Sequence, residues 1–356
     1  MSETGGSDAG ERIDIFSDRL VPEFVVGRAA DTLGSVGELA ALQRIFPRLP
    51  GATSALLGPG DDAAVVRAPD GRFVVTTDLM VHGPDFRLAW TTPFDLGWKA
   101  AATNLSDVAA MGAVPTALVV AIAAPPDSPV TLLEGIADGL REACALLAPG
   151  CGVVGGDLSA SDTLTVAVTA FGDLEGRAPV LRSGARPGDV VAVAGPLGLA
   201  GLGLHLLFAR AIDGDGKPDA AAAVVLRGEH PVPLAAQLAP RPPIPAGRLA
   251  ALAGATSMLD LSDGLALDAR RIAEASSVCL DLFRDHLESD GIDLDLTLGG
   301  GEDHSLLATF PPEVVLPDGF RVIGVVTAGS GLALDGEPHD GSRGWDPYRG
   351  WNGLAG

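Results

Sequence analysis

The chain has few positive charges. Among its 356 residues only two are lysines, Lys99 and Lys217, and no stretch is basic. With 46 acidic residues against 24 lysines and arginines, the formal net charge is −22 at pH 7. A surface of this sign repels the phosphate backbone of nucleic acids. Nucleic-acid binding is therefore not expected.

Cysteines and long apolar runs are also scarce. The three cysteines, Cys144, Cys151 and Cys279, show no Cys-x-x-Cys or metal-binding spacing, and their odd number argues against a disulfide framework. The longest apolar run, residues 116–124, is far shorter than the ~20 residues of a membrane-spanning helix. Residues 1–10 lack the basic and apolar regions of a signal peptide. We expect a cytoplasmic protein with no membrane segment, whose cysteines are core thiols.

Length and local pattern predict a two-domain α/β (α+β) protein. A chain of 356 residues corresponds to about two domains at ~100–200 residues each. Residues 1–34 have weak periodicity and many small or acidic residues, which is typical of a disordered tail. Turn-rich segments at 176–179 and 183–189 predict a boundary. We therefore expect an N-terminal domain over 35–178 and a C-terminal domain over 179–356.

Strand and helix signals alternate along both domains. Thr92 and Pro93 are typical of a helix N-cap and first position, and Gly112 of the residue after its end, so a helix is expected between them. Short apolar runs at 65–66 and 73–75 flank a Pro-Asp-Gly turn and predict a hairpin. Further strands are expected at 117–123, 164–171, 190–194 and 257–261, and further helices at 132–147, 199–212 and 265–276.

Five short acidic motifs punctuate the sequence. Each combines aspartate with glycine, serine or threonine, and they occupy residues 58–62, 76–78, 104–107, 155–157 and 260–264. Carboxylate and hydroxyl oxygens are the ligands that Mg²⁺ prefers, and glycine lets backbone N–H groups approach phosphate oxygens. Taken singly each motif has a simpler explanation, because Asp and Gly also dominate turns and helix caps. Taken together, the motifs predict Mg²⁺-assisted phosphoryl transfer.

The helix expected before Gly112 carries a polar stripe that includes one of these motifs. Lys99, Thr103 and Asp107 recur at four-residue spacing, and Asn104 stands three residues before Asp107. Such stripes usually face water, but this stripe includes only one acid, among Ala, Val and Met, which favours a buried face turned toward a site. Carboxylates about 4 Å apart repel by roughly 4 kcal/mol at an effective dielectric near 20, so acids that converge need cations between them.

The order and spacing of the motifs resemble the thiamine-monophosphate kinase family, within the superfamily of aminoimidazole ribonucleotide synthetase. The resemblance runs from Gly37 to Trp351, and its most specific segments are residues 58–64, 76–78, 99–113, 155–157, 182–185, 260–265 and 300–303. It implies a two-domain PurM-like fold whose N-terminal sheets pair in a homodimer, with ATP near that interface. It also implies ATP-dependent conversion of thiamine monophosphate to thiamine diphosphate with several Mg²⁺ ions.

The resemblance also implies roles for individual positions. Ligands of Mg²⁺ would be Asp62, Thr76, Thr77, Asp78, Asp107, Asp157, Asp260 and Asp263, among which Asp62, Asp157 and Asp263 would be the catalytic acids. ATP would contact Gly156, Asp157, Arg182 and Ser262, and the acceptor would contact Asp85, Glu302 and Trp351. An acid and an aromatic suit a cationic thiazolium and its aminopyrimidine, since a cation over an indole gains roughly 0.5–2 kcal/mol.

One position departs from the family pattern. The family usually has a histidine before the phenylalanine that follows the Thr-Thr-Asp motif, whereas this chain has Asp85 before Phe86. An acid there should repel a phosphate. Three explanations are open: His82 takes the role, Asp85 recruits another cation, or the phosphate binds more weakly. That His82 is an ordinary surface residue is an equal alternative to the first.

The implied reaction needs no general base. A phosphate monoester has a second pKa near 6, so its oxygen is largely anionic at pH 7. The obstacle is the approach of two anions, which carboxylate-bound Mg²⁺ and Arg182 would ease. Other enzymes of the superfamily fit less well, because selenophosphate synthetase expects a reactive cysteine near the start and the hydrogenase-maturation branch expects one at the C-terminus. A binding protein with a decayed site is the remaining alternative, yet all five motifs keep their acids.

Overall fold

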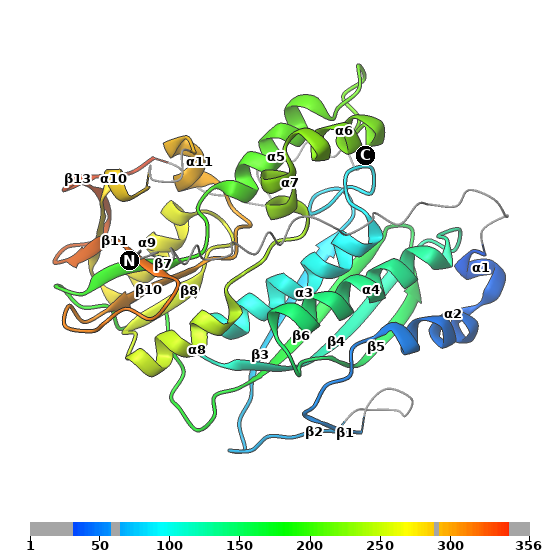
Figure 1. The fold of residues 1–356 in the computed structure, drawn as a ribbon, viewed down its shortest axis with the longest axis horizontal. Helices are drawn as coiled ribbons and strands as arrows, with labels where there is room; N and C mark the ends of the chain where they lie inside the picture. The colour runs from blue at the N-terminus through cyan, green and yellow to red at the C-terminus, as the bar shows by residue number, and fades with distance from the viewer. Residues whose placement is uncertain (1–30, 58–64, 288–291, 342–356) are drawn as a thin grey trace, which may run out of the picture. The chain divides into compact units, whose positions relative to one another are not determined.

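The computed structural model describes residues 31–57, 65–287 and 292–341 (Figure 1). The N-terminal elements are α1 (Leu33–Val36), α2 (Glu38–Ile45), a 3₁₀ turn η1 (Phe46–Arg48), β1 (Ala55–Leu57), β2 (Val65–Val66), β3 (Val74–Val81), α3 (Pro93–Ala110), β4 (Val114–Ala124), α4 (Val130–Leu147), β5 (Val153–Ala160) and β6 (Thr165–Asp173). The helix expected from Thr92 is confirmed as α3, whose N-cap Thr92 forms a capping box with Asp95.

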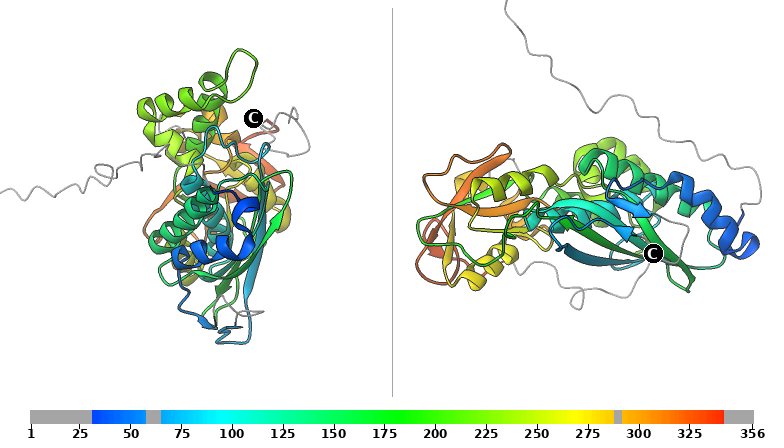
Figure 2. Two further views of the ribbon diagram at one scale, coloured as in Figure 1. Left: turned by 90° about the vertical axis from the view of Figure 1, so that its right-hand side faces the viewer. Right: turned by 90° about the horizontal axis from the view of Figure 1, so that it is seen from below.

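A four-stranded sheet with two helices on one face organises these elements (Figures 1 and 2). Its strand order is β3-β6-β4-β5, and only the β4–β5 pair is parallel. The covering helices α3 and α4 approach closely at two glycines. A Cβ on Gly97 would lie 2.0 Å from the Ile136 carbonyl oxygen, and one on Gly139 would lie 2.0 Å from that of Phe94. Any larger residue at either position would push the two helices apart.

The predicted hairpin between residues 65–66 and 73–75 is wrong. Strand β2 pairs with β1, whereas β3 pairs along its whole length with β6, about ninety residues later in the chain, from Val74 opposite Gly172 to Val81 opposite Thr165. The Pro-Asp-Gly segment does turn, because the Asp70 carboxylate accepts a hydrogen bond from the Arg72 amide. A local turn signal does not specify which strand the following segment pairs with.

A second, seven-stranded sheet occupies the C-terminal part, in the order β13-β12-β9-β11-β7-β10-β8. Its strands are β7 (Val190–Ala194), β8 (Ser257–Asp260), β9 (Cys279–Leu282), β10 (Leu306–Phe310), β11 (Phe320–Thr327), β12 (Gly331–Leu334) and β13 (Glu337–Pro338). The helices are α5 (Leu199–Arg210), α6 (Ala220–Glu229), α7 (Pro231–Leu238), α8 (Ile244–Ala253), α9 (Leu265–Ser276), α10 (Arg284–Leu287) and α11 (Leu294–Gly299). The helix predicted over 265–276 is confirmed.

Helix α3 is buried because it packs against both sheets. Strand β10 is buried on both faces: Leu306, Ala308 and Phe310 join the core that contains α3, and Leu307 joins a second core beneath α9. This explains why β10 is apolar at every position except Thr309. Among the described residues no helix is long and apolar enough to cross a membrane. Polar side chains on α3 therefore lie between β3 of the first sheet and β8 of the second, which are far apart in the sequence.

Candidate active site

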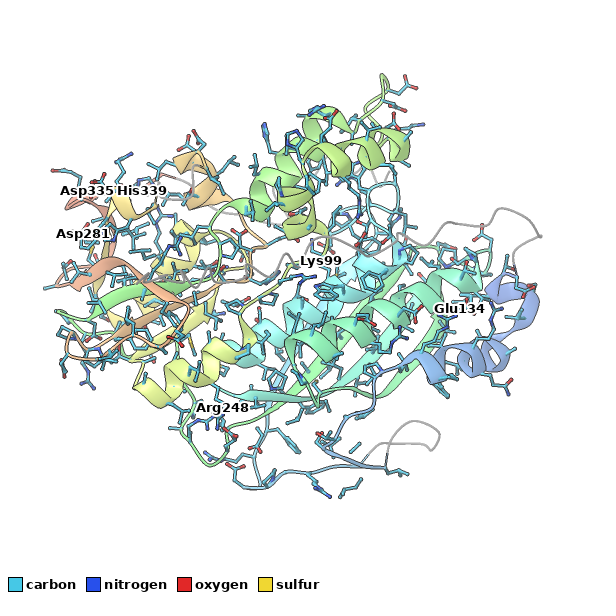
Figure 3. All side chains as sticks on the ribbon, viewed as in Figure 1. Lys99, Glu134, Arg248, Asp281, Asp335 and His339 are labelled. Carbon is cyan, nitrogen blue, oxygen red and sulfur yellow. The ribbon has the colours of Figure 1, made fainter. Side chains whose placement is uncertain are left out.

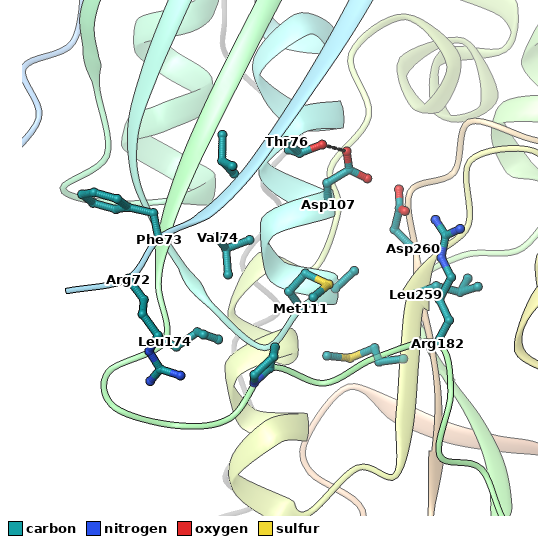
Figure 4. Close-up of a pocket in the computed structure, with 14 residues that line it drawn as sticks. Arg72, Phe73, Val74, Thr76, Asp107, Met111, Leu174, Arg182, Leu259 and Asp260 are labelled. Atoms are coloured by element: carbon teal, nitrogen blue, oxygen red, sulfur yellow. Dashed lines mark hydrogen bonds between the residues drawn. The ribbon is translucent and has the colours of Figure 1, made fainter. Parts of the chain in front are cut away.

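The C-terminal half of α3 meets β3 through polar side chains. The Thr76 hydroxyl donates to Asp107 Oδ2 at 2.8 Å (Figure 4). The Asp78 amide donates to Asn104 Oδ1 at 3.2 Å. Thr76 and Asp78 lie on the same face of β3 because side chains alternate along a strand. The polar stripe of α3 therefore faces β3 rather than water, in agreement with the buried face that the sequence favours.

The same stretch of α3 also meets the end of β8. The Ser106 hydroxyl donates to Asp260 Oδ2 at 2.7 Å, and His304 Nδ1 lies 3.2 Å from that oxygen. Asp107 and Asp260 line one cavity of about 700 Å³, together with Arg182 (Figure 4). The structure thus brings together Thr76, Asp78, Asp107 and Asp260 from two sheets and one helix.

Burial and mutual repulsion shift the pKa values of these carboxylates. Burial and the nearby charges of Asp260 and Asp78 raise the pKa of Asp107 to about 7. Burial also raises the pKa of Asp78. Burial would also raise the pKa of Asp260. The hydrogen bond and charge of His304 and the hydrogen bond from Ser106 outweigh burial, so the pKa of Asp260 is lowered. Such a group of acids is stabilised when a cation binds among them.

The side chains of this group fit Mg²⁺, since each offers an oxygen ligand: Thr76, Asp78, Asp107 and Asp260. Within the described ranges no three acidic, histidine or cysteine side chains already surround one point as a metal cage. The predicted ligand Asp62 lies outside the described residues, and phosphate oxygens and water commonly complete a Mg²⁺ shell. We therefore regard Asp78, Asp107 and Asp260 as part of a site that nucleotide phosphates would complete.

Asp263 is held by two residues that the sequence reasoning missed. Arg271 Nη2 donates to Asp263 Oδ2 at 2.7 Å, and its Nη1 donates to Asp268, which in turn accepts the Asp263 amide at 3.1 Å. Asp268 is 1% exposed, and its burial raises its pKa to about 6. The sequence does contain a signal for this pair of residues. Asp268 and Arg271 are three residues apart and therefore share one face of the predicted helix over 265–276.

We expect Arg271→Lys to lower kcat about tenfold with little loss of stability, because a lysine cannot bridge two carboxylates as a planar guanidinium does and Asp263 would lose its fixed orientation. Steady-state kinetics and a thermal melt measure both effects. Arg270→Lys is the matched control on the same helix, since Arg270 donates to the His339 and Gly341 carbonyl oxygens, away from Asp263. Equal kcat values for the two variants would refute the positioning role.

Two predicted residues lie on the other face of the four-stranded sheet. Thr77 alternates with Thr76 and Asp78, and its hydroxyl donates to the Val168 carbonyl. Asp157 shares a row with Ala121, Ala167 and Leu79 on that outer face. Its neighbour Gly156 stands three strands from Asp78, about 14 Å at ~4.8 Å per strand. Within one chain, the structure does not bring Thr77, Gly156 and Asp157 together with Asp107.

A second cavity has a volume of about 650 Å³. The segment after β8 borders both cavities, because Asp260 lines the first cavity and Ser262 lines the second. Lys99, labelled in Figure 3, is buried on α3. It forms an ion pair with Glu302 at 2.8 Å, and Gln237 donates to the other Glu302 oxygen. The Glu302 side chain is 33% exposed, so this fixed carboxylate faces the second cavity. We call this cavity the acceptor cleft, after the role that the family resemblance implies for Glu302.

The backbone around Glu302 is strained. Glu302 has φ 67° and His304 has φ 51°, in the left-handed region that non-glycine residues seldom adopt. Between them Asp303 is buried, and it accepts the Gly198 and Ala200 amides at the start of α5. This helix cap holds the segment in place and fixes Glu302 at the cleft. The glycine-rich segment at 299–304 thus has a structural part, Asp303, beside the candidate ligand-binding part, Glu302.

Asp85 and His82 face different cavities. Asp85 lines the acceptor cleft and accepts the Val81 amide at 2.7 Å, whereas His82 lines a separate cavity of about 550 Å³. This placement favours the alternative that His82 does not replace the usual histidine. Trp351, the other predicted acceptor contact, lies outside the described residues.

We therefore expect His82→Ala to leave KM for the acceptor within about twofold, and Asp85→Asn to raise it several-fold. The reason is that an acid at the cleft attracts a cationic acceptor and loses that charge as asparagine. KM values for acceptor and ATP, measured for both variants, check this. A several-fold rise for His82→Ala alone would revive the replacement hypothesis.

A family model matches the first sheet and its acidic motifs. Residues 60–174 match the N-terminal domain of AIR synthase related proteins. The chain is 43% identical over 330 residues to the thiamine-monophosphate kinase of Mycobacterium tuberculosis, covering 89% of this chain and 93% of that protein. These features define a two-sheet protein of the AIR synthase related class, and the PurM-like fold expected from the sequence is confirmed.

Solved structures agree with this class. The thiamine-monophosphate kinase of Stenotrophomonas maltophilia K279a has 29% identity and a TM-score of 0.69, covering 85% of this chain and 98% of that one. A structure described as AaThiL complexed with AMPPCP and TMP has 30% identity and a TM-score of 0.66, covering 80% of this chain and 90% of that one. The chain belongs to the thiamine-monophosphate kinase family.

Proposed function

We propose that this chain transfers the γ-phosphoryl group of ATP to thiamine monophosphate, which yields thiamine diphosphate. Apart from family membership, one observation carries the proposal. Asp260 lines the acidic cavity together with Asp107, and Ser262, two residues later, lines the acceptor cleft together with Glu302, so the short segment 260–262 borders both. A phosphoryl donor held by cations in the first cavity and an acceptor in the second would meet at this segment.

Mg²⁺ is the cation we propose for the acidic cavity. Bound there, it would neutralise phosphate charge during in-line transfer. Asp78, Asp107, Asp260 and Asp263 would hold it, with Thr76 beside them and Asp62 from outside the described residues. Arg182 and Ser262 would contact the nucleotide from the two cavities. Glu302, fixed by Lys99 and Gln237, would face the positive thiazolium of the acceptor.

The acceptor needs no deprotonation at neutral pH. Its phosphate oxygen is already largely anionic, given a second pKa near 6. The chain's own residues therefore have to orient two anions and exclude water. We place the nucleotide and metal groups chiefly in the proposed domain 35–178, and the acceptor groups Glu302 and Trp351 in the proposed domain 179–356. Both substrates are small soluble metabolites, in keeping with a cytoplasmic enzyme.

We also propose a homodimer formed through the outer face of the four-stranded sheet. Phe73, Val75 and Leu79 alternate along and just before β3, with exposures of 42, 59 and 59%. An exposed apolar strand face of this kind is typical of an interface. Thr77 and Asp157 lie on the same outer face, so pairing would place them at the interface, where we propose that Gly156 and Asp157 contact ATP.

Leu79→Lys is expected to convert the dimer to a monomer and to reduce activity, because a charge would be buried in the paired face. Light scattering after size-exclusion chromatography gives the mass. Leu146→Lys, which changes a leucine 50% exposed on α4, is the matched control and should leave the mass unchanged. A monomeric wild-type chain with full activity would contradict the dimer proposal.

Acceptor selectivity tests the proposed function. ADP release in the presence of Mg²⁺ and ATP should be at least about a hundredfold faster with thiamine monophosphate than with thiamine, whose neutral hydroxyl would first have to lose a proton to a base. A similar rate with both compounds, or no ADP release with either, would reject the proposed acceptor.

A further inference from the structure

Arg87 is a buried cation without a counter-ion. The side chain is 8% exposed, and no carboxylate or other hydrogen-bond acceptor in the described ranges is paired with its guanidinium. Its contacts are two aromatic rings: the guanidinium carbon lies 4.8 Å from the centre of Trp90 and 4.7 Å from that of Phe208. Aromatic faces offset part of the charge but leave N–H donors to be satisfied. An arginine cannot resolve this by losing its proton.

The guanidinium is held in position from two sides. Trp90 is 4% exposed and its indole N–H donates to the Ala211 carbonyl at 2.8 Å, which ties the segment before α3 to the end of α5. Phe208 lies on α5 and packs edge-on against Trp90, with ring centres 5.0 Å apart. Arg87, Trp90 and Phe208 all line the acceptor cleft. None of the Arg87 nitrogens is among the fully enclosed unpaired atoms of the described residues, so these donors remain accessible at a built wall of that cleft.

Arg87 stands at the end of the cleft that is remote from the acidic cavity. Along α5, Gly201 lies against Gly300, and Phe208 follows seven residues later, about 10 Å at 1.5 Å per residue. Along α3, Lys99 precedes Asp107 by two turns, and Arg87 comes before the helix begins. The cleft thus runs from Ser262, through the Lys99–Glu302 pair, to Arg87.

This order matches the parts of the proposed acceptor. The phosphate must lie at the Ser262 end, where the nucleotide would be. The positive thiazolium would then lie beside Glu302, and the aminopyrimidine, which is neutral and has ring nitrogens with free lone pairs, would reach the far end. A cation at that end also disfavours the reversed orientation, because it would repel the thiazolium.

We propose that Arg87 is a specificity-determining residue that donates hydrogen bonds to the ring nitrogens of the acceptor's aminopyrimidine. The inference rests on the proposed function, whose acceptor it specifies further. The aromatic clamp keeps the guanidinium desolvated and fixed, so the donors are ready before the acceptor enters. A ligand without acceptor nitrogens in that ring would displace water from the guanidinium without replacing its hydrogen bonds, and such a ligand is rejected.

Binding of three probes to Arg87→Met and to the wild type tests the proposal, by calorimetry without ATP. The probes are thiamine monophosphate, thiamine, and the phosphorylated thiazole fragment that lacks the aminopyrimidine. We expect Kd for the first two to rise by the same factor, about 10- to 100-fold for a lost charged hydrogen bond, and Kd for the fragment to stay unchanged. A rise confined to the two phosphorylated probes would assign Arg87 to the phosphate instead and overturn the proposal.

Stability separates a recognition role from a structural one. Arg87→Met removes an unpaired buried charge, so the ligand-free variant should melt no lower than the wild type. Arg87→Lys, which keeps the charge without the planar fork, should lose most of the affinity as well. Arg241→Lys is the matched control, since Arg241 also stacks on a tryptophan, 5.2 Å from the Trp98 ring, but is exposed and outside the cleft lining.

Failure of the Arg87 inference and failure of the proposed function give different results. If the wild type binds and phosphorylates thiamine monophosphate but Arg87→Met and Arg87→Lys bind all probes normally, the Arg87 inference is wrong and the proposed function stands. If the wild type binds none of the probes, the acceptor assignment is wrong, and the inference is overturned with it. Normal binding by Arg241→Lys is expected in either case.

Discussion

Replacing Asp263 by Asn is expected to lower kcat for thiamine monophosphate by about a hundred- to a thousandfold, the usual cost of removing one electrostatic contact to a charged transition state. Asparagine keeps the size of the side chain and an oxygen that can accept from Arg271. The substitution therefore removes the charge offered to a metal ion while packing and orientation stay the same. Steady-state kinetics at several Mg²⁺ concentrations measure the loss.

Asp127→Asn is the matched control for this substitution. Asp127 is an exposed aspartate in the turn between β4 and α4, and it should tolerate the change with full activity. Thermal melts of both variants should agree with the wild type within a few degrees. A near-normal kcat for Asp263→Asn would exclude Asp263 from the metal site.

Asp107→Asn is expected to abolish most activity and yet to stabilise the metal-free protein at pH 8. The pKa of Asp107 is about 7 in the folded chain, raised by burial and by Asp260 and Asp78, against 3.8 for the ordinary side chain. A raised carboxyl pKa contributes stability that is present below pH 3.8 and is lost as the pH rises through 7. The total is at most about 4 kcal/mol, at 1.36 kcal/mol per pKa unit.

Thermal melts in chelator and in millimolar Mg²⁺, from pH 5 to pH 8, measure this effect. In chelator, the melting temperature of Asp107→Asn minus that of the wild type should grow as the pH rises. Mg²⁺ should raise the melting temperature of the wild type more than that of the variant, because it binds the folded acids. Parallel pH profiles and equal Mg²⁺ effects would argue against a cation site at Asp107.

Local patterns in the sequence predicted individual elements well. Helix α9 follows its apolar periodicity from Leu265 to Ser276, and Thr92-Pro93 gives the start of α3. The alternation of β3 would also have separated Thr77 from Thr76 and Asp78, since neighbouring residues of a strand face opposite sides.

Long-range pairing could not be predicted from local patterns. Strand β3 pairs with β6 rather than with the nearby β2, and Ser106 meets Asp260 across 154 residues of sequence. No element was assigned to residues 220–238, where α6 and α7 pack on α5 beside Trp90. Such contacts depend on which buried surfaces fit together, so here the resemblance of ordered motifs to a family was more informative than periodicity.

The two products of a single reaction provide the most direct test of phosphoryl transfer at this site. Purified chain is incubated with ATP, thiamine monophosphate and Mg²⁺, and ADP and thiamine diphosphate are quantified by chromatography. Equal amounts of both products are expected, with both lost in chelator and regained when Mg²⁺ is restored. ADP without thiamine diphosphate, or thiamine diphosphate formed at an undiminished rate in chelator, would contradict a Mg²⁺-dependent thiamine-monophosphate kinase.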